Sequence, residues 1–241
     1  MEWTDDAVVL GARRYGETSV ILETLTRQHG RHLGLVRGGK SKTLQPVLQP
    51  GNTVKLVWRA RIDDHLGHFA VEGRTLHAAR YLTSRLALFA VVHLCALVRL
   101  LPERDPHAGL FESLSDMLDH LDEPDLAPAL AARVELEILA ELGFGLDLTA
   151  CAATGETIDL AYVSPRTGRA VSRAAGEPYR DKLLPLPAFL RGEGAPRGDE
   201  VVQAFRLTRF FLERDVFGPR GLAMPQGRQA LVDAAAMDRH G

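Results

Sequence analysis

Five short segments with the pattern of β-strands occupy the first 75 residues of the 241-residue chain. They are rich in β-branched residues, and glycine and proline turns separate them. No helical periodicity begins before Leu76. Five short strands in so few residues are typical of a small closed barrel such as an OB-fold. The expected strands are residues 7–10, 19–25, 33–36, 53–59 and 68–72, with a loop at residues 13–17.

The chain contains no Asp or Glu between Glu23 and Asp63, a window of 39 residues. At the overall frequency of acids, about five would be expected there. A small β module with many cations and no acids attracts a polyanion, and nucleic acid is the first candidate. The alternative is a solvated face that takes its acids from elsewhere in the fold. The cations of the window are Arg27, Arg31, Arg37, Lys40, Lys42, Lys55, Arg59 and Arg61.

After residue 76 the pattern becomes helical. Helices are expected around residues 81–100, 110–121, 130–142 and 199–218, and the tail after Gly221 is expected to be loosely held. Gly143 suits the end of the third helix. Residues 147–182 are irregular, with a hairpin turning at residues 164–168. The sequence therefore predicts an α+β fold with two domains, residues 1–75 and residues 76–241.

The net charge of −2 hides an asymmetry, because residues 1–80 have a balance of +4 and the remainder a balance of −6. A basic and an acidic half indicate two domains with different partners. Only two cysteines are present, Cys95 and Cys151, which favours a reducing compartment. The acidic N-terminus does not fit a signal peptide, and the 13-residue apolar run 86–98 is too short to span a bilayer. We expect a cytoplasmic protein.

Residues 34–41 match the phosphate-loop pattern G-x-x-x-x-G-K-[ST]. That motif binds phosphate only where the loop opens a helix, and Pro46 and Pro50 follow too closely for one. A nucleotide triphosphatase is therefore kept only as the enzyme alternative, and Lys40 and Lys42 are interpreted as contacts to backbone phosphates. We expect no catalytic residues and no cofactor. Glu135, Glu137 and Glu141 are interpreted as a solvated helix face.

Two histidine pairs, His29 with His32 and His65 with His68, have the spacing of metal ligands. Residues three apart on a strand face opposite sides, so neither pair converges by itself. No cysteine lies nearby in the sequence, and we expect no metal there. His93 is interpreted as a core histidine.

Several short stretches together resemble the bacterial RecO family of recombination-mediator and DNA-repair proteins. They are residues 14–19, 29–30, 36–40, 48–51, 137–145 and 151–155, in this order along nearly the whole chain. The resemblance implies an N-terminal OB-fold, a helical domain and no enzymatic turnover. It also implies binding to single- and double-stranded DNA, annealing of complementary strands, and contacts with RecR and the single-stranded-DNA-binding protein. Recombinase could then load on gaps, in a nucleoid-associated role.

Many members of this family carry a zinc site of the form C-x-x-C…C-x-x-C, and this chain departs from it. Cys151 occupies the first position, but Thr154, Ser172 and Ala175 fall on the others. One thiolate cannot hold a structural zinc ion. We therefore expect residues 147–182 to form a zinc-ribbon-like insertion without metal.

Two sets of binding residues follow. The eight cations of the acid-free window, together with Arg14, are the expected DNA-binding set. In the acidic half, Arg133 and Leu136 pair a cation with an apolar side chain one helical turn apart. The resemblance implies that such a site takes the C-terminal tail of the single-stranded-DNA-binding protein, although Arg133 could equally pair with Glu137. An OB-fold RNA-binding factor is the alternative within the binding class, because single strands of either kind suit a basic groove.

Overall fold

The computed structural model describes residues 1–62, 65–124 and 126–237. Packing divides the chain into two compact units, Met1–Glu123 and Pro124–Gly241. The first unit contains the strands expected before residue 76 and also three helices. The predicted domain boundary between residues 75 and 76 falls inside the first compact unit and stays a prediction. Within the described residues no helix is long and apolar enough to cross a membrane.

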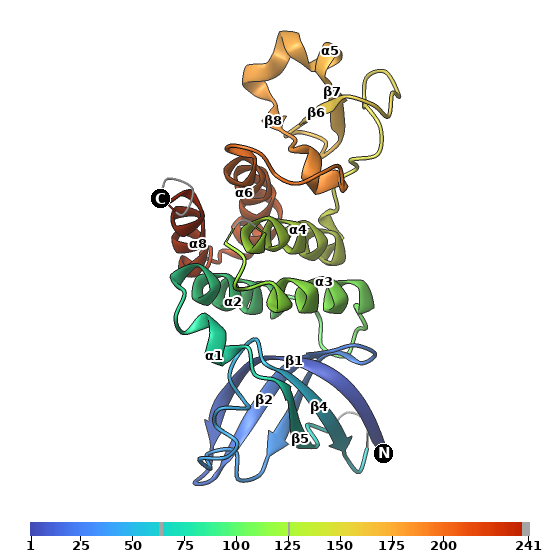
Figure 1. Ribbon diagram of the computed structural model, residues 1–241. Helices are drawn as coiled ribbons and strands as arrows, with labels where there is room; N and C mark the ends of the chain where they lie inside the picture. The colour runs from blue at the N-terminus through green and yellow to red at the C-terminus, as the bar shows by residue number, and fades with distance from the viewer. Residues whose placement is uncertain (63–64, 125, 238–241) are drawn as a thin grey trace. The chain divides into compact units, whose positions relative to one another are not determined.

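The five N-terminal strands close into a barrel in the order β1-β2-β3-β5-β4, which confirms the predicted architecture (Figure 1). All neighbours are antiparallel except β3 and β5. Buried and partly exposed residues alternate strictly along β3 and β4, because successive side chains of a strand point to opposite faces. Trp58 and Phe69 are the largest side chains of the barrel core. The strands are β1 (Glu2–Tyr15), β2 (Ser19–Thr26), β3 (Gly30–Val36), β4 (Thr53–Arg59) and β5 (His68–Thr75).

Strand β1 is much longer than predicted, and the loop expected at residues 13–17 begins only after Tyr15. The register of β1 against β2 shifts between Val9 and Gly11, and the strand then continues to Tyr15. Such a β-bulge bends a strand without ending it. The predicted strand end at residue 10 is therefore the position at which β1 bends around the barrel.

Three helices belong to the same unit: α1 (Ala78–Tyr81), α2 (Arg85–Val98) and α3 (Ala108–Asp119). The Ser84 hydroxyl accepts a hydrogen bond from the Ala87 amide at 3.2 Å and begins α2 as an N-cap. Asn52, which is fully buried, connects the barrel to α1. Its amide group donates to the carbonyls of Pro46 and Val47, and its Oδ1 accepts from the Ala78 amide at 2.9 Å.

The second unit contains the remaining helices and a small three-stranded sheet. The third predicted helix is α4, and Gly143 ends the turn that follows it with a positive φ of 89°. The predicted hairpin at residues 164–168 is confirmed, since it joins β6 to β7. The elements are α4 (Ala127–Leu139), η1 (Ala140–Phe144), β6 (Leu160–Val163), β7 (Ala170–Ser172), α5 (Arg173–Gly176), η2 (Glu177–Lys182), β8 (Leu184–Pro185), η3 (Ala188–Arg191), α6 (Glu200–Phe211), η4 (Leu212–Phe217), α7 (Gly218–Arg220) and α8 (Gln226–Met237).

The C-terminal helix α8 is not loosely held, so the expectation for the tail was wrong for this helix; residues 238–241 lie outside the described residues. Arg228 of α8 is buried and donates to both carboxylate oxygens of Glu135 on α4. It also donates to the Phe205 carbonyl and to the Thr208 hydroxyl on α6. Glu135 is therefore not part of a solvated face, because its side chain is fully buried in this network.

Candidate nucleic-acid interface

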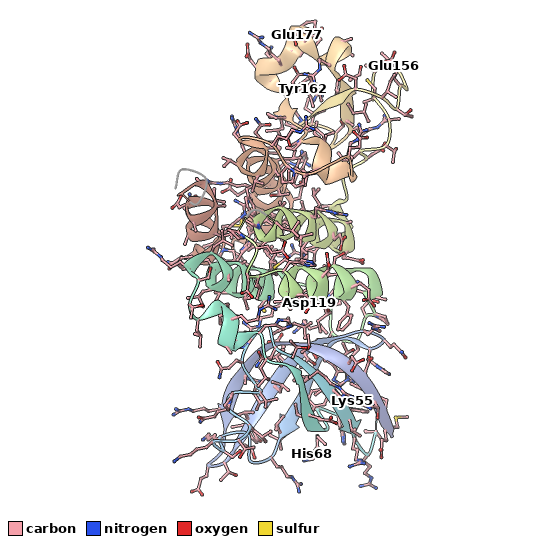
Figure 2. The ribbon with its side chains drawn as sticks, in the orientation of Figure 1. Lys55, His68, Asp119, Glu156, Tyr162 and Glu177 are labelled. Atoms are coloured by element: carbon pink, nitrogen blue, oxygen red, sulfur yellow. The ribbon has the colours of Figure 1, made fainter. Side chains whose placement is uncertain are left out.

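The register of the barrel brings two predicted cations and one histidine together at the ends of three strands. Leu35 of β3 pairs with His68 of β5, which pairs in turn with Arg59 of β4. Arg37 follows β3, and its Nη2 lies 3.4 Å from Nε2 of His68. Figure 2 shows His68 at the end of the barrel that points away from α2 and α3. Arg37, Arg59 and His68, which are 9 to 31 positions apart in the sequence, thus share one surface.

This surface contains an open cavity of about 450 Å³, which we call the barrel-tip groove. Arg37, Arg59 and His68 supply its polar groups, and the rest of the lining is apolar. A groove with an apolar floor and guanidinium groups can hold flat bases while binding the phosphates between them. The lining residues are Leu35, Val36, Arg37, Leu44, Val57, Arg59, His68, Phe69, Ala70 and Val71.

The loop between β3 and β4 carries Lys40 and Lys42 and is attached to the turn between β1 and β2. Lys40 Nζ donates to the Gly16 carbonyl at 2.7 Å, and the Lys40 amide donates to the Thr18 carbonyl at 3.1 Å. Lys42 is exposed. After Ser41 the chain forms turns up to Gly51 rather than a helix. The structural context of a phosphate loop is therefore missing, and the sequence match does not form a nucleotide site.

Arg14 and Arg61 are exposed, like Lys42. Next to Arg14 the aromatic side chain of Tyr15 is 55% exposed, and it stands at the same β1–β2 turn that receives Lys40. An exposed aromatic ring among cations is a stacking platform for a single-stranded base. Sequence reasoning assigned no binding role to Tyr15 or His68. Their placement depends on the length of β1 and on the β3–β5 pairing, which the local pattern did not reveal.

Three of the predicted cations, including Arg59 of the barrel-tip groove, have carboxylates beside them. Arg59 Nε and Nη2 donate to Glu2 at 2.9 and 3.0 Å, and this hydrogen bonding lowers the pKa of the Glu2 carboxyl. Arg27 pairs with Glu112 at 3.0 Å. Lys55 lies on β4 opposite Asp6 of β1 and Glu72 of β5. The missing acids of the window are thus partly supplied by other strands and helices, as the alternative interpretation requires.

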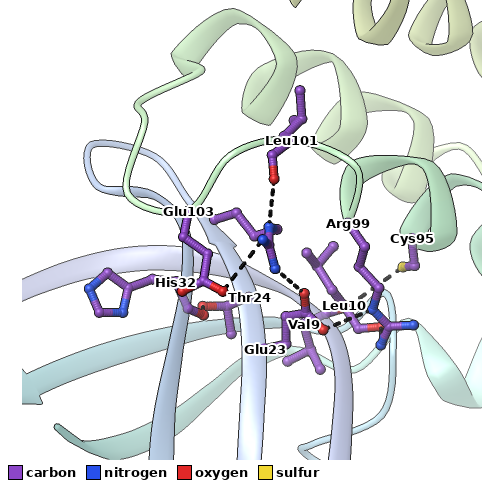
Figure 3. Close-up of polar contacts among 10 residues, drawn as sticks. Val9, Leu10, Glu23, Thr24, His32, Cys95, Arg99, Leu101 and Glu103 are labelled. Carbon is purple, nitrogen blue, oxygen red and sulfur yellow. Dashed lines mark hydrogen bonds and ion pairs between the residues drawn. The ribbon is translucent and has the colours of Figure 1, made fainter. Parts of the chain in front are cut away.

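The guanidinium group of Arg31 is hydrogen-bonded to partners inside the first unit. Its Nη1 donates to Glu23 at 2.6 Å, and its Nε donates to the Leu101 carbonyl at 2.8 Å (Figure 3). The Arg31 side chain is 15% exposed, and Glu103 lies 3.5 Å from its Nη2. A guanidinium with these partners holds the segment after α2 against β3 and has little freedom to contact a phosphate.

The second predicted site lies on α4, where Arg133 is exposed and Leu136 is half-buried. Of the ion pairs found among the described residues, none joins Arg133 to Glu137. The cation is therefore accessible beside an apolar side chain.

The histidines proposed as possible metal ligands have other neighbours. The ring of His29 stacks on Trp3 with centroids 4.0 Å apart, and its Nδ1 lies 3.0 Å from Asp5 Oδ2. His32 is buried against Trp58. His93 is fully buried on α2, as predicted. In residues 1–62, 65–124 and 126–237 no group of three or more His, Cys, Asp or Glu side chains is arranged to hold a metal ion.

Residues 151, 154 and 172 still lie together in the ribbon-like insertion. Cys151 is buried, and burial by itself raises the pKa of its thiol. The hydrogen-bonding groups of Ser172, Thr154 and the Ala153 backbone beside the sulfur outweigh burial and lower the pKa of Cys151 to about 6. Two of the positions that would otherwise be zinc ligands thus lie beside this one thiol.

Known proteins resemble the chain over nearly its whole length. Residues 1–73 match the family described as Recombination protein O N terminal, and residues 82–222 match Recombination protein O C terminal. A DNA repair protein RecO from Methylobacterium nodulans is 57% identical over 244 residues, covering 99% of both chains. One from Chelativorans sp. (strain BNC1) is 59% identical over 97% of this chain and 95% of its own. Another, from Mesorhizobium japonicum, is 57% identical over 100% and 95%. The chain therefore belongs to the RecO family.

Proposed function

We propose that the chain is a non-catalytic DNA-binding mediator of recombinational DNA repair. In this role it binds single- and double-stranded DNA, anneals complementary strands, and assists recombinase loading on gaps covered by single-stranded-DNA-binding protein. The observation that carries the proposal is the barrel-tip groove, in which Arg37, His68 and Arg59 surround an apolar floor. The relatives that match the chain are named DNA repair proteins, which supports the same function.

The cations that suit phosphate contact are those that form no ion pair with a carboxylate among the described residues. We assign the main contacts to Arg14, Arg37, Lys40, Lys42 and Arg61. Arg27, Lys55 and Arg59 have carboxylates beside them and are assigned a secondary share. Arg31 is removed from the set because its donors are used inside the first unit.

The helical unit is proposed to bind proteins rather than DNA. Arg133 with Leu136 offers a cation beside an apolar side chain, which suits the C-terminal carboxylate and apolar end of the single-stranded-DNA-binding protein. RecR is the second proposed partner, on a surface that we do not assign. A cytoplasmic, nucleoid-associated location accompanies this role.

The test combines binding and annealing in one set of variants. Arg37, Lys40 and Lys42 are replaced by Ala, and a matched control replaces Arg166, Arg180 and Lys182 in the ribbon-like insertion. We expect the first variant to lose affinity for oligonucleotides and to anneal complementary strands slowly. Its log–log salt slope should fall by roughly 2 to 3, since each phosphate contact contributes about 0.7–0.9.

The control variant removes the same charge and should retain both activities. Loss of binding in the control, with retention in the first variant, would move the DNA site to the insertion. Equal affinity of the wild-type protein for RNA and DNA, without annealing of DNA, would favour the RNA-binding alternative.

A further inference from the structure

A second cavity of the first unit lies on the outer face of β1, β2 and β3, where the register of β1 shifts. It has a volume of about 320 Å³, and we call it the bulge pocket. It shares no lining residue with the barrel-tip groove. Its lining residues are Gly11, Ala12, Arg13, Ile21, Glu23, Leu33 and Arg99.

The β-bulge and a glycine together place Arg99 at this pocket. Arg99 Nη2 donates to the Leu10 carbonyl at 2.7 Å, and its Nε donates to Glu23 at 3.0 Å (Figure 3). A side chain at Gly11 would overlap the guanidinium, so that only glycine allows this approach. Arg99 therefore lies across the bulge in a fixed orientation, with 42% of its side chain still exposed.

The rim of the pocket carries more positive than negative charge. Glu23 is the only acid of the lining, and its two oxygens already accept from Arg31 and Arg99. Arg13 is exposed, and its side chain forms no hydrogen bond or ion pair with any residue that the structure describes. Nη1 of Arg99 likewise donates to no acceptor among the residues that the structure describes. The rim thus offers two guanidinium groups with unused donors, a geometry that suits a carboxylate.

The floor of the pocket is aliphatic, since it is formed by Ala12, Ile21 and Leu33. None of its lining residues is aromatic, whereas sites for single-stranded bases depend on aromatic stacking. We propose that the bulge pocket binds a segment of a partner protein in which an apolar side chain stands beside a carboxylate. This inference goes beyond DNA binding and uses a surface separate from the groove.

Nuclear magnetic resonance titration with short peptides tests the pocket in the full chain. The probe is N-acetyl-Leu-Asp-amide, compared with N-acetyl-Leu-Asn-amide, which lacks the charge, and N-acetyl-Gly-Asp-amide, which lacks the apolar group. We expect the first peptide to shift the amide signals of Gly11, Ala12 and Leu33 with a Kd on the order of 1 mM, as suits so small a ligand. Each of the other two should bind at least threefold more weakly.

A second exposed arginine of the first unit provides the matched variant. Arg13→Gln should weaken the first peptide at least threefold, whereas Arg85→Gln removes the same charge from α2, outside the pocket lining, and should leave it unchanged. Equal binding of the three peptides, no shifts at the pocket, or equal effects of the two variants would overturn the proposal. Stronger shifts of the same signals by thymidine 5′-monophosphate would also overturn it and assign the pocket to nucleic acid.

Discussion

Arg228 donates to both carboxylate oxygens of Glu135, at 2.8 and 2.9 Å, although 93 positions separate the two residues. Neither side chain is more than 4% exposed. The pair fixes the last helix, α8, to the first helix of the second unit, α4. Removing one partner leaves a buried charge without compensation, which is more damaging than removing both.

The first prediction concerns this pair. Glu135→Ala should lower the free energy of unfolding of the second unit by about 3–5 kcal/mol, measured by urea denaturation. The double variant Glu135→Leu with Arg228→Met should be considerably more stable than the single variant. Gln229→Ala, which removes only an exposed contact with Asp233, serves as the control. A single variant as stable as the control would show that the buried pair does not hold α8.

A second prediction separates structural from binding arginines. Arg31→Ala should lower the free energy of unfolding of the first unit by about 2 kcal/mol, because it removes charged hydrogen bonds to Glu23 and to the Leu101 carbonyl. Oligonucleotide affinity of the folded variant should change little. Arg37→Ala should do the reverse, with weaker binding in a fluorescence anisotropy titration and unchanged stability. Weaker DNA binding by the folded Arg31→Ala variant would show that Arg31 does contact DNA.

The third prediction concerns Cys151, whose pKa is lowered from an ordinary 9.0 to about 6 in the folded protein. The folded state therefore favours the thiolate. This contribution to stability is present in full above pH 9 and is lost as the pH falls toward 6. The stability difference between wild type and Cys151→Ala should shrink over that interval.

Cys95→Ala is the matched control for this pH series. Burial raises the pKa of Cys95 to about 12, so this thiol stays neutral in the folded protein between pH 6 and 9. Its contribution to stability should be constant at the acidic end and should fall slightly toward pH 9, where the unfolded thiol ionises, which is the direction opposite to that of Cys151. A difference for Cys151→Ala that is constant across the series, measured by urea denaturation, would contradict the lowered pKa of Cys151. Ultraviolet absorbance of the thiolate provides an independent titration.

A fourth prediction is that the purified protein contains no stoichiometric zinc. Residues 154, 172 and 175 provide no thiolate or imidazole, and one cysteine is too few for a structural site. Treatment with a chelator should leave the melting temperature unchanged. Elemental analysis that finds about one zinc ion per chain would contradict this expectation.

The fifth prediction concerns the proposed partner site on α4. Arg133→Glu should markedly weaken binding of a peptide that ends like the single-stranded-DNA-binding protein, as measured by calorimetry, because it reverses the charge beside Leu136. Oligonucleotide affinity should stay the same. Arg206→Glu changes an exposed arginine of α6 and should have no effect. Tail binding that survives Arg133→Glu would place the pocket elsewhere.

The barrel could be predicted from the sequence because its signals are local. Alternation along β3 and β4 depends only on neighbouring residues, and so does the turn at Gly143. The length of β1 could not be predicted in this way, because pairing with β2 decides whether the chain continues past Gly11. The role of Glu135 was likewise hidden, since its partner Arg228 lies in a distant helix.

The acid-free window shows the same limit for the candidate site. An absence of acids along the chain is not an absence of acids in space, because Glu23, Glu2 and Glu112 reach Arg31, Arg59 and Arg27 from outside the window. The cations at the barrel tip were predicted by residue type alone. Their grouping with His68 and Tyr15 required the strand register.

The hydrogen bond from Lys40 to the Gly16 carbonyl has a kinetic consequence. The loop between β3 and β4 is already attached at its base, so it need not become ordered when a DNA strand binds. Binding of DNA then requires no preceding conformational change. Association should then be limited mainly by diffusion and electrostatic attraction, with a rate constant that falls steeply as salt is added. Differences in affinity among oligonucleotides would accordingly come from differences in their dissociation rate constants.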